Sequence, residues 1–147
     1  MKKIAQFVKK WPFSTVVTIL IWVVSLIPIP ETPLDDVKFI DKWTHIVMYG
    51  GLSFVIWVEY LTRRKNAVII SRLVLCGWLA PVMMGGLLEL LQAYCTGGRR
   101  SGDWLDFAAN AAGATLILCG GMLWVWHRAT KRKDENGAKS CRNAGRP

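Results

Sequence analysis

Four long apolar segments, separated by short charged stretches, dominate the sequence. They lie at about residues 13–29, 43–61, 73–94 and 104–126. A transmembrane helix needs about 20 predominantly apolar residues, and each segment is close to that length. Hydrophobic residues make up 52% of the 147-residue chain, more than an ordinary soluble domain of this size contains. The pattern predicts an all-α integral membrane protein with four transmembrane helices.

The first apolar segment also has some features of a cleaved signal peptide, because lysines are frequent in residues 1–10 that precede it. It is long for such a peptide, and no small-residue cleavage site follows it. Instead come Pro28, Pro30 and Pro33. We therefore expect an uncleaved helix that begins at Trp11-Pro12, where proline is favoured, and that the later prolines end.

The distribution of lysine and arginine predicts the orientation of these helices. Basic residues concentrate in residues 1–10, in the linker at 63–72 and in the tail at 127–147. The other two loops hold only Lys38, Lys42, Arg99 and Arg100. Because basic loops stay on the cytoplasmic side, both termini are expected to be cytoplasmic.

The organisation is therefore predicted as a basic start (1–10), a four-helix membrane domain (11–126) and a polar tail (127–147) that is expected to be disordered. The net charge of +9 would also suit a nucleic-acid-binding protein. Membrane topology explains it more simply, since the basic residues flank apolar segments. The four cysteines form no CxxC pair, so we expect free thiols that behave as small apolar residues.

Polar side chains form helical stripes at the predicted outer ends of the second, third and fourth segments. The stripes are Asp41, His45 and Tyr49 at i, i+4 and i+8; Glu89 and Gln92 at i and i+3; and Asp103, Asp106 and Asn110 at i, i+3 and i+7. In the predicted topology they share one depth and can face one another. Ionisable groups inside a membrane are costly and functional by default. We therefore predict a polar pocket that opens to the outer leaflet.

These residue types suggest two kinds of role. Histidine exchanges protons near neutral pH, and a carboxyl group in an apolar wall can act as an acid, so the catalytic candidates are Asp41, His45, Glu89 and Asp106. Arginine offers a fork that suits phosphate or carboxylate groups. The candidates for substrate binding are Lys42, Tyr49, Gln92, Arg99, Arg100, Asp103 and Asn110.

Several alternatives remain at this stage. The polar residues could form an internal network that only pins the helices together. They include plausible metal ligands, but no HxxxH or HExxH spacing occurs, and we predict neither a metal nor a cofactor. Ser101 has no GxSxG context that would mark a nucleophile. Glu59, with Arg63 at i+4, is interpreted as an interfacial ion pair, and Ala109-x-x-x-Gly113 as a helix-packing surface.

The polar motifs resemble those of the VanZ-like family. The resemblance lies in Asp41-Lys42-x-x-His45-x-x-x-Tyr49-Gly50, in Glu89-x-x-Gln92, and in Arg100-Ser101-x-Asp103-x-x-Asp106-x-x-x-Asn110-x-x-Gly113. It covers roughly residues 26–121 and departs from the family pattern at Gly102, where an apolar residue is frequent. It implies a small four-helix protein of the bacterial inner membrane, in a family named after a member linked to teicoplanin resistance.

The function expected from these features is binding or modification of an envelope lipid or glycolipid head group. Arg100 would hold an anionic group, and the resemblance adds a link to glycopeptide susceptibility. Two other hypotheses remain. The polar residues could be structural in a protein that acts through a membrane-protein partner or as a homo-oligomer. A small transporter has less support, since the sequence shows no internal repeat.

Overall fold

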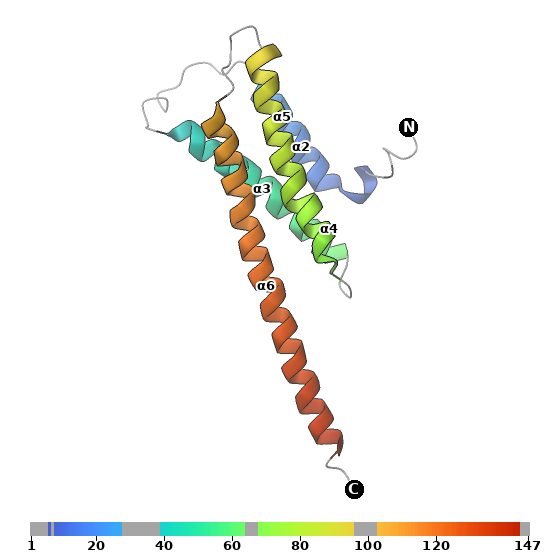
Figure 1. The fold of residues 1–147 in the computed structure, drawn as a ribbon. Coiled ribbons are helices and arrows are strands. Elements are labelled where there is room, and N and C mark those ends of the chain that lie inside the picture. Colours follow the sequence, from blue (N-terminus) through green and yellow to red (C-terminus); the bar gives the residue numbers. More distant parts are fainter. Residues whose placement is uncertain (1–5, 7, 28–38, 64–67, 96–102, 145–147) are drawn as a thin grey trace.

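The computed structural model describes residues 6, 8–27, 39–63, 68–95 and 103–144. All regular structure in these ranges is helical, which confirms the predicted all-α class. The elements are α2 (Pro12–Leu26), α3 (Ile40–Arg63), α4 (Ile70–Val74), η2 (Leu75–Leu79), α5 (Ala80–Cys95) and α6 (Trp104–Ala144). Figure 1 shows α2 beside α5, while α3 crosses α6.

Two helices are long and apolar enough to span a membrane. One is the continuous helix Ile70–Cys95, formed by α4, η2 and α5, and the other is Trp104–Glu135 within α6. Helix α2 is apolar but shorter. It begins with Pro12 in the first turn, as predicted, and it ends where Ile27 becomes extended. Ile27 precedes Pro28, and a residue before proline disfavours the helical conformation.

The carboxylate of Glu59 caps the N-terminus of α2. It accepts hydrogen bonds from the backbone nitrogens of Phe13 (3.2 Å) and Ser14 (3.0 Å), and also from the Ser14 hydroxyl. These are N–H groups that the first turn of a helix leaves without a partner. Glu59 is 5% exposed, and its carboxylate forms this cap, which the interpretation as an interfacial ion pair with Arg63 did not include. The capping contact joins α3 to α2.

Helices α3 and α6 pack most extensively, and glycines make their close approach possible. A Cβ atom added at Gly113 would collide with the carbonyl oxygen of Ile46 and lie 3.0 Å from the nitrogen of Gly50. A Cβ at Gly50 would lie 3.3 Å from the carbonyl oxygen of Gly113. Ala109 is also buried. The predicted helix-packing surface is therefore confirmed at Gly113, which meets α3 directly.

A π-helical turn, η2, interrupts the helix between α4 and α5. It lies immediately before Pro81, which has no N–H to donate to the carbonyl of Gly77 and whose ring crowds that carbonyl. A wider turn relieves this conflict. Gly77 packs directly on the indole of Trp57. The turn thus lets a proline stay inside an apolar helix.

Helix α6 continues beyond residue 126 to Ala144, where the sequence predicted a disordered tail. Figure 1 shows it extending well past the other helices. Its 41 residues correspond to about 60 Å at about 1.5 Å per residue, roughly twice the thickness of a hydrocarbon core. A helix already formed only needs to propagate, and the lysine, arginine and alanine residues of this region favour it. The Arg128 guanidinium also stacks over the Trp124 ring, 4.5 Å from its centroid.

Candidate functional site

One end of the bundle holds a group of ionisable and polar side chains that we call the polar cluster. It is made up of Asp41, Lys42 and His45 from α3, Glu89 from α5, and Asp103, Asp106 and Asn110 from the start of α6 and the residue before it. His45, Glu89, Asp106 and Asn110 are buried. The cluster lies opposite the end where Glu59 caps α2, because Asp41 and Glu59 are near opposite ends of α3.

Lys42 links the carboxylates of the cluster. Its ammonium group donates to Asp106, to Asp103 Oδ2 at 2.9 Å and to Asp41 Oδ2 at 3.4 Å. The bonds to Asp103 and Asp106 connect α3 with the start of α6. Burial disfavours the charge of Lys42, but the hydrogen bonds to Asp106 and Asp103 outweigh it, so that the pKa of Lys42 is raised. The hydrogen bond from Lys42 lowers the pKa of Asp103.

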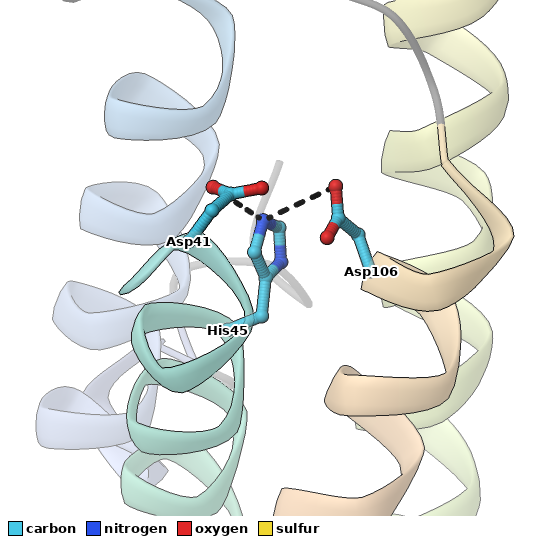
Figure 2. A group of neighbouring side chains, drawn as sticks. All are labelled: Asp41, His45 and Asp106. Carbon is cyan, nitrogen blue, oxygen red and sulfur yellow. Dashed lines mark ion pairs between the residues drawn. The ribbon is translucent and has the colours of Figure 1, made fainter. Parts of the chain in front are cut away.

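His45 is held by Asn110. Its Nδ1 atom lies 2.9 Å from Asn110 Oδ1, and the Nε2 atom faces Asp41 Oδ1 at 3.7 Å and Asp106 Oδ2 at 3.9 Å. Figure 2 shows the imidazole between these two carboxylates. An amide oxygen only accepts hydrogen bonds, so Nδ1 carries a hydrogen. In the neutral ring the free electron pair then belongs to Nε2, between two acids.

Glu89 connects α5 to the other two parts of the cluster. Its Oε1 atom lies 3.5 Å from Asn110 Nδ2 and 3.8 Å from His45 Nδ1. Its Oε2 atom accepts a hydrogen bond from the backbone nitrogen of Asp103 at 3.3 Å. Polar groups from α3, α5 and α6 therefore form one continuous network.

The starts of two helices place most of these acids. Asp103 caps α6: its Oδ1 atom accepts from Leu105 N at 3.0 Å, and Asp106 lies in the first turn. Asp41 lies in the first turn of α3. Carboxylates are favoured at helix N-termini, where unpaired N–H groups give a partial positive charge. Phe39, just before α3, has φ 66°, a left-handed conformation that non-glycine residues rarely adopt.

The remaining predicted binding residues have other positions. Tyr49 is buried beside the cluster, packed with Ile21, Leu52 and Leu88. Gln92 donates from Nε2 to the carbonyl oxygen of Ser25 at 2.8 Å, so one of its bonds ties α5 to α2. Arg99 and Arg100, which were also predicted to bind substrate, lie outside the described residues.

Asp41, His45 and Asp106 form a group that could hold a metal ion, the one such group among the described residues. One ligand atom from each lies within 4.8 Å of the others. Figure 2 shows the three side chains facing one another. One nitrogen and two oxygen ligands suit several divalent metals. Lys42 already donates to Asp41 and Asp106, however, so an ammonium group competes for the same oxygens.

A groove of about 590 Å³ lies between α5 and α6 and reaches the polar cluster. Glu89 and Asp103 are its charged lining residues; the rest of the lining is mostly apolar and includes Gly86, Leu90, Ala93, Tyr94, Trp104 and Phe107. A Cβ at Gly86 would lie 3.1 Å from the Phe107 ring. Glu89 is thus shared by the groove and the cluster.

The sequence pattern missed the groove and the cap at Glu59. The residues around Glu89 (88–92) indicate which face of the helix is polar. They do not indicate that Gly86 lies against Phe107. No local sequence motif marks Glu59 as a helix cap, because Ser14, the residue that it caps, lies 45 residues away in the sequence.

Cys76, Cys95 and Cys119 are free thiols, which confirms the prediction for these three cysteines. No family model matches the chain, and no curated protein or solved structure matches it significantly. The resemblance to the VanZ-like family therefore rests on the motifs of the sequence.

Proposed function

We propose that this chain is a multi-pass membrane protein whose polar cluster binds or modifies the head group of an envelope lipid or glycolipid. In this proposal α2, α3, the helix Ile70–Cys95 and α6 are four spans, both termini are cytoplasmic, and the cluster faces the outer leaflet. His45, with Asp41, Glu89 and Asp106, would transfer protons if a bond is made or broken.

The observation that supports this function best is that the groove and the cluster share Glu89. An apolar groove in a membrane-spanning helix is accessible to lipid chains, and a buried polar cluster at its end offers partners to a head group. Ligand sites combine these features: mostly apolar walls with a few converging polar groups. A purely structural network would need no adjoining groove.

The motifs suggest that the protein belongs to the VanZ-like family and lies in a bacterial inner membrane. We propose on this basis that it affects susceptibility to teicoplanin. Deletion of the gene, complemented by wild type or by Asp106→Asn, would test this. Changed susceptibility that only the wild type restores would support the proposal, and unchanged susceptibility on deletion would remove it.

Native mass spectrometry of the purified protein tests head-group binding. Wild type is compared with Glu89→Gln, Asp106→Asn and Arg100→Ala, and with Glu135→Gln on the exposed far part of α6 as a control. We expect a co-purifying lipid that the control keeps and that is lost from, or reduced in, the other three variants. Lipid retained equally by every variant would contradict the proposal.

The topology can be tested separately with reporters fused at the C-terminus and in the loop after α5. A C-terminal alkaline phosphatase should be inactive and a loop reporter should be active. The reverse result would place the cluster on the cytoplasmic side.

A second candidate function is supported by the closed network around Lys42. Each carboxylate of the cluster has a partner within the chain, as a structural network requires. The protein would then act through a membrane-protein partner. In that case Glu89→Gln and Asp106→Asn should lower thermal stability and partner capture without any dependence on lipid.

A further inference from the structure

We infer that the groove between α5 and α6 binds a membrane lipid whose head group carries a primary ammonium group. This inference rests on the proposed function and adds the class of head group. The sequence led us to expect an anionic head group held by Arg100. The charged residues that line the groove are instead acidic, so they favour a cationic group on the ligand.

The first argument concerns how a ligand arrives. The groove follows α5 from Met83 to Tyr94 and meets the first turn of α6 at Trp104 and Phe107. Both helices belong to the segments that are apolar enough to span a membrane. A ligand in this groove therefore shares its surroundings with lipid chains. A volume of about 590 Å³ lies within the usual range of ligand pockets, roughly 300–1,000 Å³.

The second argument concerns the charged groups at the groove. Both are carboxylates, Glu89 and Asp103. Ionised carboxylates only accept hydrogen bonds, and their two oxygens offer about four acceptor positions. Glu89 uses Oε2 for Asp103 N and Oε1 for Asn110 at 3.5 Å, a long contact. Acceptor positions remain for a donor on the ligand.

The third argument is charge balance. Among the described residues of the polar cluster, the carboxylates of Asp41, Glu89, Asp103 and Asp106 outnumber the cations. These are the ammonium group of Lys42 and, when it is protonated, the imidazole of His45. Lys42 donates to Asp41, Asp103 and Asp106, and none of its hydrogen bonds within the described part of the chain reaches Glu89, whose Oε1 atom lies 3.8 Å from His45 Nδ1. Partly buried negative charge needs a compensating cation. An ammonium head group at Glu89 supplies both the charge and the donors.

The test uses delipidated full-length protein and three lipids with identical acyl chains. Phosphatidylethanolamine has an ammonium group with donors, phosphatidylcholine has the charge without donors, and phosphatidylglycerol has hydroxyl donors without a cation. The protein is given an equimolar mixture, and bound lipid is counted by native mass spectrometry. We expect phosphatidylethanolamine to exceed each of the others by about tenfold, a ratio that corresponds to about 1.4 kcal/mol.

Two variants distinguish the contribution of the apolar groove to lipid binding from that of the Glu89 carboxylate. Ala93→Phe places a large side chain at an exposed position of the groove and should reduce binding of all three lipids. Leu123→Phe, at an exposed position of α6 outside the groove, is its control and should change nothing. Glu89→Gln should bind less lipid in total, and the lipid that remains should show no preference for phosphatidylethanolamine.

The outcomes distinguish the two proposals. Lipid that Ala93→Phe displaces, with equal binding of the three head groups or a preference for phosphatidylglycerol, would overturn this inference and leave lipid binding intact. No specific lipid, or lipid unaffected by Ala93→Phe and by Glu89→Gln, would overturn both.

Discussion

The imidazole of His45 and the carboxamide of Asn110 meet at 2.9 Å, between Nδ1 and Oδ1, across the interface of α3 and α6. Asn110 is fully buried, so the bond is shielded from water. Because the amide oxygen must accept, the contact selects one tautomer of the neutral histidine. It also directs Nε2 toward Asp41 and Asp106. Asn110 is thus a positioning residue for His45.

The tautomer of His45 is directly testable by ¹⁵N NMR with labelled histidine. We expect neutral His45 to carry its hydrogen on Nδ1, whereas free histidine favours Nε2. Replacement of Asn110 by leucine should remove this selection and restore the ordinary tautomer. The chain has only two histidines, so His127→Gln assigns the signals. An Nε2-bound hydrogen in the wild type would contradict the contact.

The same substitution should also lower stability. Asn110→Leu removes the hydrogen bond between Asn110 Oδ1 and the buried Nδ1 atom of His45, and a buried polar group that loses its partner costs about 1–3 kcal/mol. Thermal unfolding in detergent should therefore occur at a lower temperature. Thr130→Val is the control, since the exposed Thr130 hydroxyl bonds only to the carbonyl oxygen of Trp126 among the described contacts. Equal losses in both variants would show that the buried bond contributes nothing specific.

Asp103→Asn should have an effect that depends on pH. The pKa of Asp103 is lowered in the folded state by the bond from Lys42. A carboxylate with a lowered pKa stabilises the fold above its ordinary pKa, and this contribution is lost as pH falls through the folded-state pKa. The difference in melting temperature between wild type and Asp103→Asn should therefore be constant near neutrality and shrink below about pH 4.

Lys42 determines how the same hydrogen bond responds to alkaline pH. Its raised pKa means that its contribution is complete below its ordinary value and is lost only as pH rises through the folded-state pKa. No alkaline loss should thus appear below about pH 10. Asp134→Asn on the exposed part of α6 controls for general charge effects. A difference that stays unchanged down to pH 2 would contradict the Lys42–Asp103 bond.

Gly113→Ala should weaken the packing of α3 against α6. The added methyl group would collide with the Ile46 carbonyl, and overpacking of this kind costs about 1–3 kcal/mol. Gly120 lies on the same helix with nothing within 4 Å of an added Cβ, so Gly120→Ala should be neutral or slightly stabilising. Thermal unfolding of both variants checks this contrast. Equal melting temperatures would contradict the close approach of the two helices.

Glu59→Gln should loosen α2. The glutamine keeps one acceptor oxygen but loses the charge that faces the start of α2, and the loss of a helix cap costs about 1 kcal/mol. Ser14→Ala, which removes one of the donors, should have a smaller effect. Limited proteolysis near residues 8–12, compared with wild type, measures the release of α2. Unchanged cleavage in Glu59→Gln would exclude the cap.

The sequence predicted the polar cluster better than it predicted the contacts between helices. Polar residues three and four apart at the ends of apolar segments define both a depth and a face, so Asp41, His45, Glu89 and Asp106 could be placed together. The contacts of Gln92 with Ser25 and of Ser14 with Glu59 depend on where α2 packs. The sequence of α2 has no charged residue that would indicate this position. The groove likewise depends on how Gly86 faces Phe107.

The wide turn Leu75–Leu79 sets the rotation of the helix faces before it relative to the helix faces after it, within the helix Ile70–Cys95. A π-helical turn holds about one residue more than an α-helical turn, so it offsets the face on which Gly77 meets Trp57 from the face that carries Glu89. Loss of one residue there would turn these faces relative to each other by about 100°. The turn itself contains no charged group. Its length nevertheless decides whether Glu89 can contact Asn110 while Gly77 packs against Trp57.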